Sequence, residues 1–298
     1  MRDFLQLCFA GLSVGSLYAL VALGFVIIFK ATGVINFAQG ALLLVGGYLA
    51  YNVHNTWGVP FYLSIPVAML LCGALGAVIE RVILRRMVGQ PVFAVIMVTI
   101  GLVFILDPVV TTIWGFDRLE LGDPWGVETI GAGDLRLAVK DVWTIGLAAA
   151  VMAAFFAFFR YSRLGVAMRA TAFDQEAAIA NGISARRVFA LSWAIAGAVA
   201  TLAGVMMSAG GPGVRPDIQF IALFAFPAII LGGLDSPGGA VVGGIIMGLT
   251  QTLTAGYQPR YAEWLGGGFD GVMPYVVMVL ILLVRPYGLF GTKEVRRV

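Results

Sequence analysis

The chain has 298 residues, of which 60% are hydrophobic and only 12% are charged, and its formal net charge at pH 7 is +3. Ordinary soluble domains carry roughly 25% charged residues, so this composition excludes a water-soluble globular protein of this length. A transmembrane helix needs about 20 apolar residues. Uncharged runs that meet or approach this length occur at residues 4–29, 31–79, 142–159, 188–214 and 236–259. The sequence therefore predicts an all-α fold, a polytopic transmembrane helical bundle.

The first predicted span, residues 4–29, contains the polar residues Ser16 and Tyr18. It is longer than the apolar region of a signal peptide, and the next apolar run follows almost at once, so we interpret it as a retained span. The turn after it contains Asn36 and Gln39.

Eight further apolar segments follow. They are predicted at residues 37–53, 60–80, 91–115, 142–159, 187–209, 219–234, 238–256 and 271–285. Segments 219–234 and 271–285 are short, and Pro227 removes a helix hydrogen bond from the first of them. One of these two is a candidate for a broken helix or a re-entrant segment, so about eight or nine spans are expected. They form a single predicted transmembrane domain, residues 1–298.

Uncharged polar side chains recur within these segments. Thr99 lies in the fourth span and Gln251 in the eighth. Together with Ser16, Tyr18, Asn36 and Gln39 they either line a weakly polar translocation pathway or make hydrogen bonds between helices.

Asp107, in the span 91–115, is the carboxylate expected at membrane depth, whereas Lys30 and Glu80 lie at helix ends where long side chains reach water. Charge inside a bilayer is costly and usually functional, which makes Asp107 a candidate pathway residue. Pro108 follows directly, so the alternative is a kinked position near the outer surface. A single carboxylate is not a proton relay, and we expect Asp107 to have no part in energising transport.

The distribution of charge predicts the topology. Basic residues cluster at Arg81, Arg85 and Arg86, again between residues 160 and 187, and again at Arg285, Lys293, Arg296 and Arg297. The positive-inside rule places all three clusters in the cytoplasm. The acidic, glycine-rich loop at residues 116–141 is then external. About nine crossings place the N-terminus in the periplasm and the C-terminus in the cytoplasm.

The predicted cytoplasmic loop at residues 160–187 encodes a short helix. Thr171 and Asp174 fit the spacing of a capping box, and Gly182 supplies a left-handed stop. Ala177 and Ala178 permit close approach of another protein, while Glu176 and arginines such as Arg169 supply polar contacts. The helix either docks on a partner or lies on the lipid surface.

Neither a catalytic nor a metal site is predicted. The chain has one histidine, His54, and two cysteines, both within apolar runs, and it contains no H-E-x-x-H motif. We expect a protein that is not an enzyme, has no cofactor of its own and has no nucleic-acid partner.

Five segments carry a family resemblance. Residues 176–182 read E-A-A-I-A-N-G, residues 34–40 read V-I-N-F-A-Q-G, and residues 230–240 read I-L-G-G-L-D-S-P-G-G-A. With G-S-L-Y-A-L at residues 15–20 and R-L-G-V-A-M-R-A at residues 163–170, they resemble LivH-type branched-chain amino acid permeases of bacterial ABC importers. Gln39 stands where histidine is frequent in that family and Ala41 where an acidic residue is frequent.

The resemblance implies a permease subunit in the bacterial inner membrane that carries branched-chain or other hydrophobic amino acids, or related small solutes. It implies a second, LivM-like permease, two cytoplasmic ATPase subunits that bind the ATP, and a periplasmic substrate-binding protein. The residues implied to couple to the ATPase are Arg169, Thr171, Asp174, Glu176, Ala177, Ala178 and Gly182. An ion-coupled secondary transporter of small solutes is the alternative, and the scarcity of intramembrane ionisable groups disfavours it.

Overall fold

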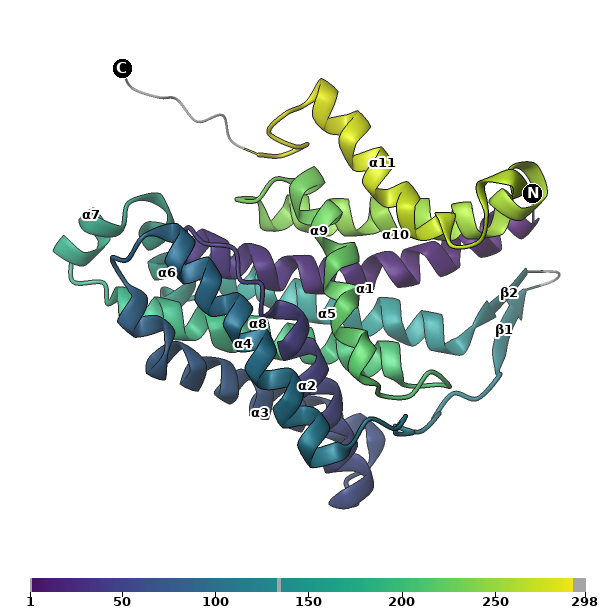
Figure 1. Cartoon of the computed structure of the whole chain (residues 1–298), viewed down its shortest axis with the longest axis horizontal. Coiled ribbons are helices and arrows are strands. Elements are labelled where there is room, and N and C mark those ends of the chain that lie inside the picture. The colour runs from purple at the N-terminus through teal and green to yellow at the C-terminus, as the bar shows by residue number, and fades with distance from the viewer. Residues whose placement is uncertain (1, 133–134, 292–298) are drawn as a thin grey trace.

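The computed structural model describes residues 2–132 and 135–291, so Lys293, Arg296 and Arg297 of the third basic cluster lie outside the described residues. The first half of the chain forms α1 (Arg2–Thr32), α2 (Gln39–Tyr51), η1 (Asn52–Thr56), α3 (Phe61–Val82), η2 (Leu84–Met87), α4 (Val92–Trp114), β1 (Thr129–Ala132) and β2 (Leu135–Ala138). The second half forms α5 (Val139–Tyr161), α6 (Arg163–Phe173), α7 (Gln175–Ala180), α8 (Ala185–Ser208), η3 (Pro216–Phe220), α9 (Ile221–Gly232), α10 (Pro237–Tyr261), η4 (Glu263–Leu265) and α11 (Phe269–Val284). Figure 1 shows the resulting helical bundle.

The described part of the chain has six helices that are long and apolar enough to cross a membrane: α1, α3, α4, α5, α8 and α10. The segments predicted to be weak, residues 219–234 and 271–285, form the short helices α9 and α11, of 12 and 16 residues. The segment predicted at residues 37–53 forms α2, of 13 residues, which continues directly into the π-helical turn η1. The start of α2 is delayed by the turn at Asn36, whose Oδ1 accepts a hydrogen bond from the backbone N–H of Ala38 at 3.0 Å.

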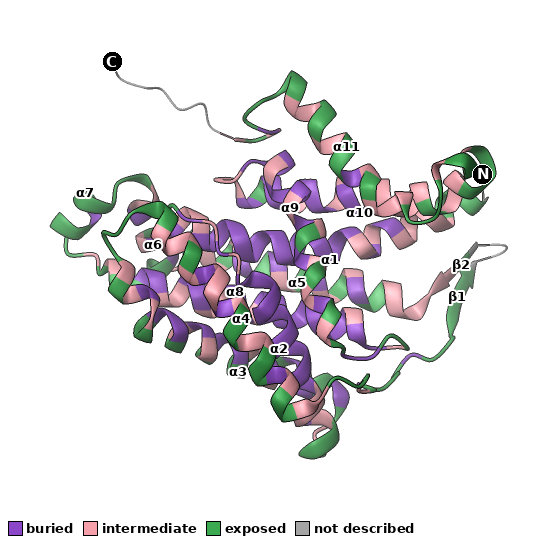
Figure 2. Cartoon of the chain, in the orientation of Figure 1, coloured by how far each residue is buried: buried purple, intermediate pink, exposed green. Residues whose placement is uncertain are grey.

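Small residues set the packing at the centre of the bundle. Gly244 of α10 lies against the backbone of Ala19 in α1, and Gly248 lies against Gly15. A Cβ added at Gly197 of α8 would lie 2.7 Å from the backbone oxygen of Cys72 in α3. Close helix approach through such residues is typical of membrane proteins, where apolar burial alone does not drive association. Figure 2 shows that the buried residues concentrate on α1, α2 and α8.

The two ends of the bundle carry different contacts and different loops. At one end, Nζ of Lys30 donates to the backbone oxygen of Asp235 at 2.9 Å, which joins the end of α1 to the turn between α9 and α10. At the other end, Nη1 of Arg260 lies 3.4 Å from Oδ2 of Asp3. The helices α6 and α7 lie at the first end, and the β-hairpin and the N-terminus lie at the second (Figure 1). The predicted basic and acidic loops are thus at opposite ends.

The loop at residues 116–141 contains an antiparallel hairpin that the sequence analysis did not predict, with Ile130 opposite Leu137. The loop is anchored to the bundle by the buried side chains of Leu121 and Trp125. The ring of Trp125 meets Phe61 at the start of α3 edge to face, with ring centroids 5.4 Å apart.

Candidate coupling loop and polar residues of the spans

The predicted loop at residues 160–187 folds as two helices separated by Asp174. Asp174 is the N-cap of α7, and its Oδ1 accepts a hydrogen bond from the backbone N–H of Ala177 at 2.9 Å. Gly182 ends the unit with a φ of +81°, and the N–H of Ile183 then bonds to the oxygen of Ala178 at 3.0 Å. This is the left-handed stop that the sequence predicted.

The predicted capping box from Thr171 to Asp174 was wrong. Thr171 lies inside α6, and its Oγ1 donates to the backbone oxygen of Ala167 at 2.9 Å. The cap of α6 is Ser162, whose Oγ accepts from the N–H of Gly165 at 2.8 Å. Thr171 and Asp174 each have a polar side chain that can cap a helix, but only Asp174 has an extended backbone, with φ −154° and ψ 106°.

The surface of α7 is small, mostly exposed and mixed in polarity. Glu176 and Ala177 are exposed, and among the described residues of α7 only Ala178 is buried against the bundle. Phe173, directly before the cap, has 95% of its surface exposed, and Ile179 has 52%. These two side chains give this segment apolar surface that is available to a partner or to a lipid surface.

Arg169 contacts the end of α5 in the described chain. Its guanidinium donates to the backbone oxygen of Phe159 and, at 3.3 Å, to that of Arg160. It also lies 5.5 Å from the centroid of the Phe159 ring. Cations favour the C-terminal end of a helix, so Arg169 fastens α6 to the end of α5. A role in coupling stays a prediction for this residue.

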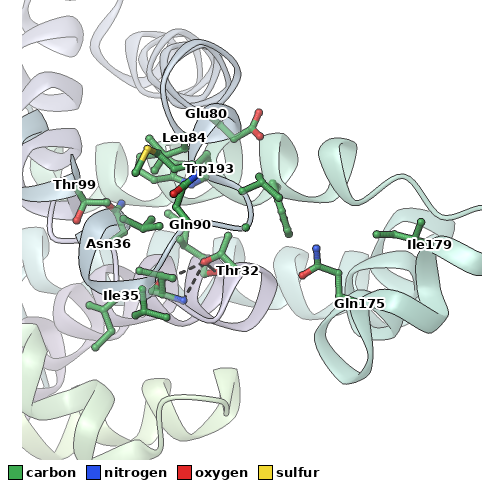
Figure 3. A pocket seen from close by; sticks show the side chains of 18 of the residues that line it. Thr32, Ile35, Asn36, Glu80, Leu84, Gln90, Thr99, Gln175, Ile179 and Trp193 are labelled. Carbon is green, nitrogen blue, oxygen red and sulfur yellow. Dashed lines mark hydrogen bonds between the residues drawn. The ribbon is translucent and has the colours of Figure 1, made fainter. Parts of the chain in front are cut away.

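A cavity of about 450 Å³ lies beside α7 at the same end of the bundle (Figure 3). Its walls come from the end of α1, the turn before α2, the end of α3, residues 87–90, the start of α4, one side of α7 and the start of α8. Two predicted pathway residues, Asn36 and Thr99, line it. Oγ1 of Thr99 accepts from the backbone N–H of Phe37 at 3.2 Å and thereby holds the turn before α2 against α4.

Glu80, which sequence analysis placed at a water-exposed helix end, is only 1% exposed. Its Oε2 pairs with Nη2 of Arg85 at 3.0 Å. Burial of Glu80 follows from the turn of the chain into η2, which folds Arg85, whose side chain is 31% exposed, back over the end of α3. The i, i+5 spacing of an acid and an arginine across a helix end was the available signal in the sequence.

Of the remaining predicted pathway residues, Tyr18 and Gln251 bond to each other, whereas Gln39 and Ser16 each make separate contacts. Tyr18 OH donates to Oε1 of Gln251, which joins α1 to α10, and the Tyr18 ring stacks on Phe224 of α9 with centroids 6.4 Å apart. Gln39 is buried, donates from Nε2 to the oxygen of Ala196 at 3.2 Å and packs against Gly24. Ser16 bonds within its own helix, to the oxygen of Leu12 at 2.8 Å.

Asp107 has a polar partner that the sequence analysis missed. Its Oδ1 accepts a hydrogen bond from Nε2 of Gln219 in η3 at 2.8 Å. The Oε1 atom of Gln219 is buried and has no hydrogen-bond partner among the described residues. The two residues are 112 positions apart, and nothing local in the sequence connects them.

The comparisons with known proteins agree with this architecture. Residues 7–282 match the family model described as the permease component of branched-chain amino acid transport systems. The chain is 32% identical over 310 residues to the high-affinity branched-chain amino acid transport system permease protein LivH of Escherichia coli K12, covering 99% of this chain and 98% of that protein. It is 30% identical to BraD of Pseudomonas aeruginosa over the same shares of the two chains. LivM of Escherichia coli K12 is 23% identical, over 92% of this chain and 67% of LivM.

Proposed function

We propose, from the premise that this chain belongs to the family of permease components of branched-chain amino acid transport systems, that it is the membrane-spanning permease subunit of an ABC importer. The proposed cargo is a branched-chain or other hydrophobic amino acid, or a related small solute. The observation that carries the proposal is the family match over residues 7–282, which includes the described membrane helices together with α6 and α7.

Transport energy must come from partner subunits in this proposal. The sequence contains no G-x-x-x-x-G-K-[ST] motif, which binds nucleotide phosphates in ATPases. The partners are two cytoplasmic ATPase subunits, a second LivM-like permease and a periplasmic binding protein. The LivM relative supports the second permease, since the two kinds of permease are related in sequence.

The end of the bundle that carries α6 and α7 is assigned to the cytoplasm of a bacterial inner membrane. The support is the basic cluster at Arg81, Arg85 and Arg86, which lies at the same end as the arginines of residues 160–187. Short loops that are rich in lysine and arginine remain on the cytoplasmic side of the membrane. The N-terminus, at the other end, is then periplasmic, and the C-terminus is cytoplasmic.

The helix α7, with its cap Asp174 and stop Gly182, is the proposed contact with the ATPase. The exposed surface of this segment includes Glu176, Ala177 and Phe173. It therefore places the small apolar side chain of Ala177 beside the charged side chain of Glu176. Such a surface permits close packing without a large apolar patch.

Cross-linking in the assembled transporter tests this contact. A Phe173→Cys variant, with Cys8 and Cys72 replaced by alanine, should cross-link to an ATPase subunit through a short thiol-reactive reagent. The matched control is Tyr261→Cys, which is 80% exposed but lies at the other end of the bundle. A cross-link from the Tyr261 position and none from the Phe173 position would contradict the proposal.

A further inference from the structure

The cavity beside α7 has the size of a small-molecule site. Its volume of about 450 Å³ lies within the range of roughly 300–1,000 Å³ that is usual for ligand pockets. In Figure 3, Gln175 and Ile179 of α7 lie across the cavity from Thr32, Ile35 and Gln90. Its walls therefore belong both to the bundle and to α7.

Two buried polar atoms of the wall, Nδ2 of Asn36 and Oε1 of Glu80, have no hydrogen-bond partner among the described residues. Asn36 is 0% exposed, and its Oδ1 accepts from Ala38, but its Nδ2 has no hydrogen-bond partner among the described residues. An unsatisfied buried donor costs free energy, and a ligand with an acceptor would recover it. The cavity is thus suited to a ligand that carries a carboxylate or carbonyl oxygen.

The charge and the apolar surface of the wall restrict the ligand further. Glu80, Asp174 and Glu176 line the cavity, and Glu80 is paired with Arg85, which is not part of the lining. The other two carboxylates, Asp174 and Glu176, favour an ammonium group and disfavour an anion without one. Ile35, Val95 and Trp193 add apolar wall, which suits an aliphatic chain.

We propose that this cavity is a cytoplasmic binding site for a zwitterionic amino acid with an aliphatic side chain, and that the bound amino acid restrains α7. The ligand carboxylate meets Asn36, and the ammonium group meets the carboxylates of Asp174 and Glu176. The inference rests on the proposed function for the orientation of the bundle and for the role of α7.

A restraint on α7 follows from how the helix is held. Among the described residues of α7, only Ala178 is buried, whereas Gln175 and Ile179 are exposed and face the cavity. A ligand in the cavity therefore adds contacts between the bundle and a helix that has few of its own. Cargo that accumulates in the cytoplasm would occupy the site and slow further import.

Equilibrium binding of labelled L-leucine to the complete transporter, purified without the binding protein, tests the site. Val95→Phe, which fills the cavity from α4, should weaken binding about tenfold or more. Met97→Phe is the matched control, because Met97 lies on the same helix, is 42% exposed and is not part of the cavity lining. Gln175→Ala, an exposed change that spares the bundle, should weaken binding as well.

Two analogues test the ligand class. 4-Methylpentanoate lacks the ammonium group and isopentylamine lacks the carboxylate, so neither should compete with L-leucine. Competition by either, equal binding by Val95→Phe and the wild type, or no binding to the wild type would overturn the inference.

Uptake by proteoliposomes separates this inference from the proposed function. L-Leucine loaded on the ATPase side should slow binding-protein-dependent uptake in the wild type and in Met97→Phe, and should slow it less in Gln175→Ala. If ATP-driven uptake occurs but internal L-leucine changes nothing, only the site is wrong. If no ATP-driven uptake occurs, the proposed function itself has failed.

Discussion

Gly182 is the residue on which the end of α7 depends most directly. Its φ is +81°, a conformation that costs residues with a side chain about 1–2 kcal/mol. A Cβ built at Gly182 meets nothing within 4 Å, so the cost of a substitution comes from the backbone and not from a clash. The same residue leads the chain into α8.

Gly182→Val should therefore permit membrane insertion but weaken ATPase association and uncouple hydrolysis from uptake. Asn181→Ala is the control, because it removes only an exposed hydrogen bond from Nδ2 to the oxygen of Ala177, 2.8 Å long. The measurement is co-purification of both ATPase subunits together with the ratio of ATP hydrolysed to amino acid transported. Normal association and a normal ratio in Gly182→Val would remove the coupling role from this loop.

Asp107 contributes a hydrogen bond and not an ion pair in the described chain. Its Oδ1 accepts from Gln219, and it has no part in the ion pairs of the described residues, which are Glu80 with Arg85, Asp217 with Arg215 and Asp3 with Arg260. The side-chain oxygen of asparagine accepts the same bond. Asp107→Asn should thus leave uptake driven by ATP and insensitive to collapse of the proton gradient. Loss of ATP-driven uptake in a folded Asp107→Asn transporter would show that the charge is required.

At the scale of elements, the contact between α1 and α10 organises the bundle. Gly15 and Gly248 bring the two antiparallel backbones together, and the Tyr18 hydroxyl bonds to Gln251 across the same pair of helices. Side chains at these glycines would separate the helices, because backbone atoms and not flexible side chains lie opposite them. Overpacking of a well-packed interior typically costs about 1–3 kcal/mol.

Gly248→Val should lower the midpoint of thermal unfolding of the purified chain, since it forces α10 away from Gly15. Gly238→Ala is the control in the same helix, because a Cβ at Gly238 meets nothing within 4 Å. An unfolding midpoint for Gly248→Val equal to that of Gly238→Ala would contradict the packing described for α1 and α10.

Some of these elements follow from local sequence and others do not. The apolar runs predicted the long helices, and Gly182 predicted the stop after α7, because each signal acts over a few neighbouring residues. The break between α6 and α7 was missed, since Thr171 and Asp174 are both competent caps and only tertiary packing decides between them. The bond between Tyr18 and Gln251 joins residues 233 positions apart and has no local signal. Because contacts between distant residues have no local signal, the sequence also does not separate the predicted pathway residues that lie together from those that lie apart.

At the scale of the whole molecule, charge divides the two ends of the bundle. The arginines near α3, α6 and α7 lie at one end, and the acidic loop with the hairpin lies at the other (Figure 1). This arrangement does not depend on how many of the short helices cross the bilayer fully. The orientation in the membrane is therefore testable separately from the span count.

Labelling of intact cells with a thiol reagent that does not cross the inner membrane tests the orientation. Val127→Cys lies in the predicted external loop at a residue that is 100% exposed, and Ala180→Cys lies on the exposed side of α7. We expect labelling of the first variant in intact cells and of the second only after the membrane is opened. The reverse pattern would invert the topology.

The central claim is that this chain is a permease whose energy comes from partner ATPases, and uptake in a reconstituted system tests it most directly. Proteoliposomes would contain the chain and the proposed partners, a LivM-like permease and two ATPase subunits, with labelled L-leucine and the binding protein on the opposite side from ATP. We predict uptake that requires ATP, that stops when the ATPase subunits are omitted, and that a protonophore does not change. Uptake of L-leucine without ATPase subunits, driven by an imposed proton or sodium gradient, would contradict the account and favour an ion-coupled carrier.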